Sequence, residues 1–147
     1  MSDAHFMRNA LNLAALQRGK TGENPAVGCL IVSDGAVIAG AATADGGRPH
    51  AEEAALAEAG ARAKGATAYV TLEPCARRSA GGTACADALI QAGVARVVIA
   101  SEDPHPNAAG AGLERLRAAG IAVELGLLRE EAEALNADFI ARWKARP

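Results

Sequence analysis

The sequence predicts an α/β protein, specifically a three-layer α/β/α sandwich around a mixed sheet of about five strands. Short apolar runs rich in Val and Ile alternate along the chain with segments whose apolar residues recur at helical spacing. Hydrophobic residues make up 50% of the 147 residues, and aromatic residues only 3%. A chain of this length forms a substantial core. Here that core must be built mainly from Ala, Val, Leu and Ile.

The first third of the chain predicts a helix followed by an antiparallel hairpin. Apolar residues recur at helical spacing over 5–18, and Gly19 ends that helix. Two apolar runs, 26–32 and 36–40, flank a Ser-Asp-Gly turn, which is typical of a β-hairpin.

The remaining elements alternate between helix and strand. Pro49 suits the first turn of a helix, and Glu52 and Glu53 suit its positive end. Because helices separate the later strands, these strands should run largely parallel. The predicted order is helix 49–59, strand 68–72, polar loop 73–82, helix 84–91, strand 94–100, helix 112–119, strand 121–125 and a single final helix 129–144.

Charge and hydropathy exclude several classes of partner. The net charge is −2, so there is no basic field to bind nucleic acid or an anionic membrane. No apolar run is long enough for a transmembrane helix, and the first residues do not resemble a secretory signal. A cytoplasmic, reducing location is therefore expected. The three cysteines are then core thiols or metal ligands.

A metal-binding pattern lies in the middle of the chain. His50, Cys75 and Cys85 each fall at or just before a predicted helix start, where the helix dipole favours a thiolate. One His and two Cys form a three-ligand zinc set with an open fourth position, as in catalytic sites. Zinc there lowers the pKa of a bound water to about 7. Glu52 follows His50 by two residues, where a proton shuttle is expected.

Taken singly, these residues have ordinary explanations. A lone buried cysteine is usually a small hydrophobic residue, and this is the simplest interpretation of Cys29, inside the first predicted strand. A lone His before a helix is usually a surface residue. The joint pattern of His-x-Glu, Pro-Cys and a further Cys is instead the signature of zinc deaminases. Nine residues separate Cys75 from Cys85, more than in the common Pro-Cys-x-x-Cys form.

The chain resembles the cytidine-deaminase-like superfamily. Within it, the chain is most similar to the deaminase domain of the bifunctional riboflavin-biosynthesis enzyme, in which a long loop between the cysteines is typical. The resemblance implies the cytidine-deaminase-like type of three-layer sandwich. It covers nearly the whole chain through segments 21–29, 47–52, 66–75, 85–90, 103–106, 110–112, 119–121 and 135–139.

The resemblance implies a role for each matching residue. His50, Cys75 and Cys85 would bind one Zn²⁺ per chain, and Glu52 would shuttle protons. Asn24 would hydrogen-bond the substrate, although an Asn at this point is more often a plain turn former. The backbone carbonyl of Ala51 would receive the attacked amino group.

The implied reaction is hydrolytic loss of ammonia from a diaminohydroxyphosphoribosylaminopyrimidine. Its partners would be this phosphorylated pyrimidine and further copies of the chain, because deaminases of this superfamily usually associate as homo-oligomers.

Three positions near the implied substrate depart from the family. Arg77, followed by Arg78, stands where a His is common, Thr43 replaces another His, and the loop between the cysteines has one extra residue. Arg77 or Arg78 could contact a phosphate, and the alternative is a solvated loop charge.

Two other functions stay open: a deaminase of a free base or nucleoside, and a non-catalytic zinc-stabilised binding module. Transfer-RNA editing is disfavoured by the charge and the sparse aromatics. Residues 1–147 are expected to form a single deaminase domain without a reductase domain, and hence without NADPH binding.

Overall fold

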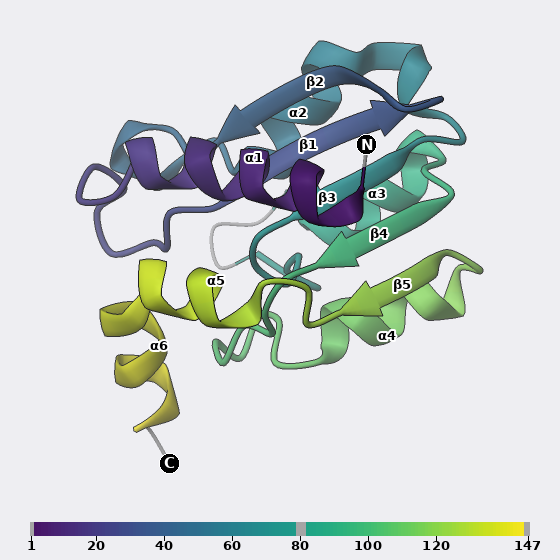
Figure 1. The fold of residues 1–147 in the computed structure, drawn as a ribbon. Helices are drawn as coiled ribbons and strands as arrows, with labels where there is room; N and C mark the ends of the chain where they lie inside the picture. The colour runs from purple at the N-terminus through teal and green to yellow at the C-terminus, as the bar shows by residue number, and fades with distance from the viewer. Residues whose placement is uncertain (1, 79–81, 146–147) are drawn as a thin grey trace.

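A computed structural model describes residues 2–78 and 82–145 (Figure 1). Its strands form one five-stranded sheet in the order β2-β1-β3-β4-β5. Strand β1 is antiparallel to both β2 and β3, whereas β3, β4 and β5 run parallel, so the predicted mixed sheet is confirmed. The strands are β1 (Gly28–Ser33), β2 (Ala36–Ala42), β3 (Thr67–Val70), β4 (Arg96–Ile99) and β5 (Ala122–Leu125).

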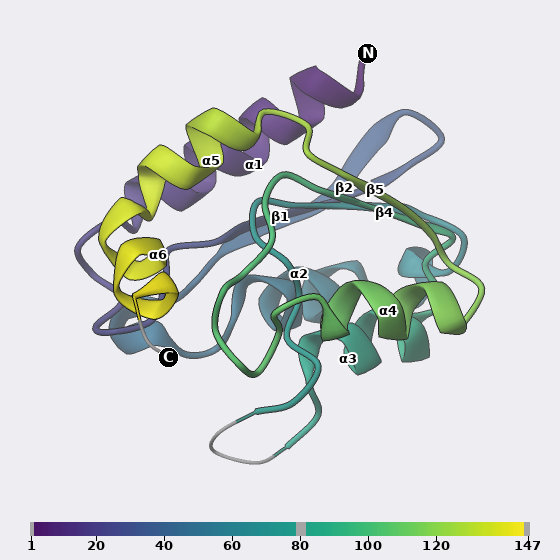
Figure 2. The same ribbon diagram turned by 90° about the horizontal axis from the view of Figure 1, so that it is seen from below.

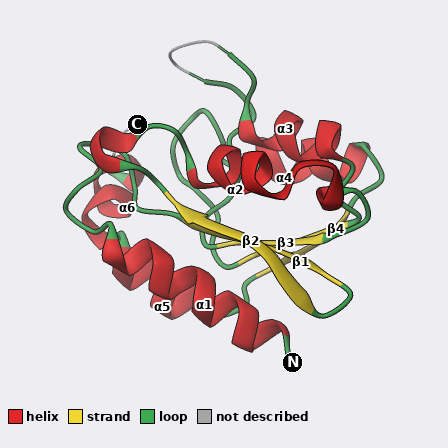
Figure 3. Ribbon diagram, turned by 90° about the horizontal axis from the view of Figure 1, so that it is seen from above, coloured by secondary structure: helices red, strands yellow, loops and turns green. Residues whose placement is uncertain are grey.

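Helices cover both faces of this sheet and give the three predicted layers (Figures 2 and 3). On one face, α1 lies beside α5, while α2, α3 and α4 cover the other face. The last helix, α6, lies beyond the carboxyl ends of β4 and β5. The helices are α1 (Asp3–Leu16), α2 (Ala51–Ala59), α3 (Cys85–Ala92), α4 (Ala111–Ala118), α5 (Arg129–Leu135) and α6 (Ala137–Lys144). None of the described helices is both long and apolar enough to cross a membrane.

The central strands are buried on both faces, which explains their continuous apolar runs. Along β1, Cys29 and Ile31 point into the core under α2 and α3, whereas Leu30 and Val32 point into the core under α1. This alternation follows from the two-residue period of a strand. Cys29 is fully buried, so its interpretation as a core residue is confirmed. Alanines of α2 let that helix approach the sheet closely.

The start of α2 differs from the prediction. Pro49 does not lie in the first helical turn, because His50 keeps an extended backbone (φ −70°, ψ 157°) and caps the helix, which begins at Ala51. Glu52 and Glu53 do occupy the first turn, at the positive end of the helix dipole. A 3₁₀ turn at Asp45–Gly47 precedes this entry, and another at Gly60–Ala63 follows the helix.

The prediction of one continuous final helix over 129–144 was wrong. Asn136 adopts φ −120° and ψ 35°, which ends α5 and begins α6. Its side chain explains the break. The Asn136 Oδ1 atom accepts the Ala26 N–H at 2.9 Å, and its Nδ2 donates to the Ala26 carbonyl at 2.8 Å. This buried pairing with a distant segment replaces the local helical geometry.

Candidate active site

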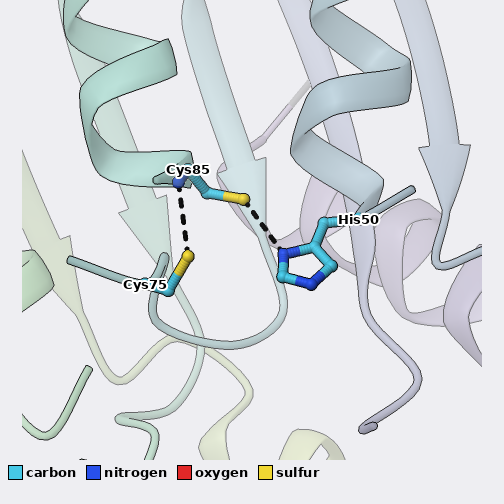
Figure 4. Close-up of side chains that lie close together, drawn as sticks. All are labelled: His50, Cys75 and Cys85. Atoms are coloured by element: carbon cyan, nitrogen blue, oxygen red, sulfur yellow. Dashed lines mark hydrogen bonds between the residues drawn. The ribbon is translucent and has the colours of Figure 1, made fainter. Parts of the chain in front are cut away.

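Three segments bring metal-ligating side chains together at the amino ends of α2 and α3 (Figure 4). His50 immediately precedes α2, Cys75 lies in the loop after β3, and Cys85 is the first residue of α3. One ligating atom from each residue lies within 4.8 Å of the others. The predicted His/Cys/Cys group is therefore assembled by the fold, although 35 positions separate its first and last members.

The donor set fits zinc. A tetrahedral zinc ion with usual Zn–N and Zn–S bond lengths places its ligand atoms about 3.6–3.8 Å apart. The His50 Nδ1 and Cys85 Sγ atoms are 3.3 Å apart, close to that spacing. Imidazole nitrogen and thiolate sulfur are also donors that zinc favours over magnesium or calcium. His50, Cys75 and Cys85 could thus hold a zinc ion with one position open.

Hydrogen bonding prepares one of the two thiols for ligation. It lowers the pKa of Cys75 to about 4, and the hydrogen bond from the Cys85 side chain is the largest cause. The backbone N–H of Cys85 also points at the Cys75 sulfur, at 3.3 Å. The same pairing raises the pKa of Cys85, because its proton is shared with the neighbouring sulfur. Of the two thiols, Cys75 is therefore the one whose environment favours the thiolate that a metal needs.

Glu52 lies in the first turn of α2 with 4% of its surface exposed. Burial disfavours the carboxylate and raises the pKa of Glu52 to about 7. A carboxyl group with such a pKa exchanges protons readily at neutral pH, as a general acid or base must. The structure thus places a buried carboxyl group in the same cleft as the metal-ligating residues.

A cleft opens over this group, and its walls come from several parts of the chain. Besides His50, Glu52 and Cys75, it is lined by the segment before β1, the loop after β4 and α6, through Asn24, Asp103, His105, Asn107 and Phe139. The side chain of Asn24 donates to the carbonyl of Gly47 at 3.0 Å. Thr43 also lines the cleft, and its hydroxyl accepts the Val27 N–H at 3.0 Å.

The two arginines after Cys75 behave differently. Arg77 is exposed, and its Nε donates to the Asn107 side chain at 3.2 Å. Arg78 is not the solvated loop charge offered as the alternative, because only 12% of its side chain is exposed. Its Nη1 lies 2.9 Å from a carboxylate oxygen of Glu53. Its buried Nε has no hydrogen-bond partner among the described residues.

The structure thus places six of the predicted site residues on the wall of this cleft and a seventh in the metal-ligating group. Ala51 is not among the residues described as lining it, and its side chain is buried in the core under α2. The residues concerned are Asn24, His50, Glu52, Cys75, Arg77 and Arg78 on the cleft wall, with Cys85 in the metal-ligating group.

Sequence reasoning assigned no role to the segment after β4. Asp103 and His105 both line the cleft, and the Asp103 carboxylate accepts the His105 N–H at 2.8 Å. Burial raises the pKa of Asp103 to about 7. The Asp-Pro-x-Pro motif at 103–106 is the sequence feature from which a role for this segment could have been predicted.

For Glu73, likewise, the sequence predicts only a position in a polar loop. Its buried carboxylate accepts backbone N–H groups from Asp103, Gly110, Gly112 and Leu113 at 2.9–3.2 Å. It thereby fixes the chain just before Cys75 to the start of α4. Its position two residues before the predicted ligand was the available signal.

Comparisons with known proteins agree with this site. The family model of the cytidine and deoxycytidylate deaminase zinc-binding region matches residues 1–101. The riboflavin biosynthesis protein RibD of Escherichia coli is 52% identical over 145 residues, which is 98% of this chain and 39% of that protein. The chain thus spans about two fifths of the length of the RibD relatives it matches.

A shorter relative matches along almost its whole length. The diaminohydroxyphosphoribosylamino-pyrimidine deaminase of Buchnera aphidicola from Schizaphis graminum is 41% identical over 98% of this chain and 97% of that protein. Among solved structures, Acinetobacter baumannii RibD superimposes with a TM-score of 0.90 at 45% identity, over 97% of this chain and 40% of that one. The chain therefore belongs to the cytidine and deoxycytidylate deaminase family.

Proposed function

We propose that this chain is a zinc-dependent hydrolase that removes an amino group, as ammonia, from diaminohydroxyphosphoribosylaminopyrimidine. The observation that carries the proposal is the buried Glu52 beside the His50, Cys75 and Cys85 group, in a cleft open to a small molecule. The full-length match to the Buchnera deaminase supports the choice of substrate. All described residues are assigned to a single deaminase domain.

His50, Cys75 and Cys85 would hold one Zn²⁺ per chain. When bound, this ion supplies the Lewis acidity that makes water a nucleophile near neutral pH. Three cysteines without a disulfide are typical of a reducing compartment, which supports a cytoplasmic location. The homo-oligomer expected from the resemblance belongs to the same proposal.

Glu52 would move the protons of the reaction. It would take one proton from the attacking water and deliver it to the ring nitrogen, and then take the remaining proton of the added hydroxyl and deliver it to the departing amino nitrogen. A C–O bond forms at the ring carbon, the C–N bond breaks, and ammonia leaves.

Asn24 and the backbone carbonyl of Ala51 would orient the substrate. The Asn24 amide donates to the Gly47 carbonyl, which fixes its side chain at the cleft wall, and its oxygen would accept a hydrogen bond from the substrate. The Ala51 carbonyl would accept from the amino group that is lost.

Arg77 and Arg78 would bind the substrate phosphate. Both guanidinium groups line the cleft, and the buried Nε of Arg78 is a donor without a partner among the described residues. Guanidinium groups pair well with phosphate oxygens. This arrangement favours a phosphorylated substrate over a free base or nucleoside.

The test measures ammonia release from the ribosylaminopyrimidine phosphate by the zinc-loaded chain and by its Glu52→Gln variant. We expect release by the parent and a loss of at least about 100-fold in the variant, with zinc content unchanged. Release from cytosine or cytidine, but not from the phosphate, would replace the proposed substrate. Zinc binding with equal rates in both proteins would instead support a non-catalytic module.

A further inference from the structure

We propose that Glu53 is a positioning residue that holds the three metal-ligand segments in fixed relation through Arg78. The inference rests on the metal-binding part of the proposed function. Its basis is a carboxylate bridge. The Glu53 Oε1 atom accepts the backbone N–H of His50 at 3.1 Å, and Oε2 accepts Arg78 Nη1 at 2.9 Å.

The first contact fixes the His ligand. Glu53 is the third residue of α2, and a carboxylate at this position can turn back to the capping residue. Here it accepts the backbone N–H of His50 and restrains the backbone from which the imidazole projects. Glu53 therefore restrains the His50 ligand by contacting the His50 backbone and not the imidazole ring.

The second contact fixes the loop that carries both cysteines. Arg78 follows Cys75 by three residues, and its Nη1 also lies 3.5 Å from the carbonyl of Thr83, two residues before Cys85. The pair is well shielded, with 12% of the Arg78 and 29% of the Glu53 side chain exposed. Screening by solvent is therefore weaker than for a surface ion pair. Through Arg78, Glu53 connects the α2 entry with both ends of the cysteine loop.

Charge adds a reason for the pair. Glu53 follows Glu52 in the chain and contacts the backbone of His50, so an unpaired carboxylate would add a second negative charge beside the metal-ligating group. The Arg78 guanidinium offsets that charge through Oε2, while Oε1 still accepts the His50 N–H. Groups that orient metal ligands in this way typically change metal affinity by about 10- to 100-fold when they are removed.

The experiment measures zinc affinity by competition with a chromophoric chelator, and it requires no catalytic turnover. We expect Glu53→Gln to raise the zinc dissociation constant by about 10-fold. Arg78→Gln should raise it by a similar factor. Because both residues act through one bridge, the zinc dissociation constant of the double variant should be about the same as that of either single variant. Glu58→Gln is the matched control, since Glu58 lies on the same helix but bonds Gly40, away from the cleft.

A second measurement separates positioning from loss of stability. The cobalt-substituted protein reports ligand geometry through its visible absorption, and Glu53→Gln should shift that spectrum while Glu58→Gln does not. Equal zinc dissociation constants and equal cobalt spectra in the parent and in Glu53→Gln would overturn the inference. Strictly additive losses in the double variant would also overturn it. If Glu53→Gln does not fold, Arg78→Gln decides alone by the same two measurements. A parent chain that binds no zinc would refute the proposed function itself, a distinct outcome.

Discussion

The carboxyl group of Glu52 has an environment that disfavours its charge. Its pKa is raised from 4.5 to about 7 by burial, so between these values the folded chain holds a proton that the unfolded chain releases. The free energy of unfolding of the metal-free chain therefore falls as pH rises through this window. The charged form costs up to about 3 kcal/mol above pH 7.

Glu52→Gln removes this titration, because the amide is neutral at every pH. We expect the metal-free variant to be more stable than the metal-free parent at pH 8, and the difference to shrink toward pH 5. Urea unfolding at a series of pH values measures both free energies. A stability difference that stays constant with pH would show that Glu52 is not protonated in the folded chain near neutrality.

Individual residues also differ in how far the sequence predicts their contacts. His50, Glu52, Cys75 and Cys85 were identifiable because their chemistry and spacing match a reaction that needs them. The contact between Glu53 and Arg78 was not identifiable, because it joins residues 25 positions apart through loop geometry that no local pattern encodes. The final conformation of Arg78 follows from a tertiary contact.

Among elements, α4 and the loop after β3 depend on each other through Glu73. Three backbone N–H groups at the start of α4, and a fourth from Asp103 in the loop after β4, point at the Glu73 carboxylate, which also lies at the positive end of α4. Gly112 belongs to this contact, since a Cβ atom there would lie 1.9 Å from the carbonyl oxygen of Pro74. The loop bearing Cys75 is thus clamped to the helix.

Glu73→Gln should loosen this clamp. The amide keeps one acceptor oxygen but turns an NH₂ group toward backbone donors, so at least one buried N–H loses its partner. We expect a loss of about 2–3 kcal/mol in the free energy of unfolding. Zinc affinity should also fall, because Cys75 follows by two residues. Urea unfolding and chelator competition check the two effects. Glu114→Gln, on the exposed face of α4, serves as control and should change neither.

The elements show where periodicity misleads. The spacing of Ala132, Leu135, Phe139 and Ile140 suits one continuous helix, and the residues on either side of 136 are indeed helical. The break comes from Asn136, whose partner Ala26 lies 110 positions earlier. Apolar periodicity reports burial on one face and carries no information about such a distant hydrogen bond.

At the scale of the whole molecule, α6 and the segment before β1 both line the cleft. Asn136 ties the junction of α5 and α6 to Ala26, next to the cleft residues Asn24 and Pro25. Phe139 of α6 lines the cleft, and Trp143 packs on the His105 ring at 4.1 Å between centroids. One wall of the cleft thus depends on contacts between the two ends of the chain.

Asn136→Ala should therefore affect substrate binding more than metal binding. Both backbone groups of Ala26 lose their buried partner, so we expect a loss of about 2–4 kcal/mol in the free energy of unfolding. The wall formed by α6 should shift, raising KM severalfold with a smaller change in kcat. The zinc dissociation constant should stay unchanged, because none of the three metal-ligating residues takes part in the contact between Asn136 and Ala26. Asn9→Ala, a substitution of a half-buried residue on α1 that does not line the cleft, is the matched control. A fall in kcat at constant KM would show that α6 shapes the reacting groups themselves and not the substrate wall.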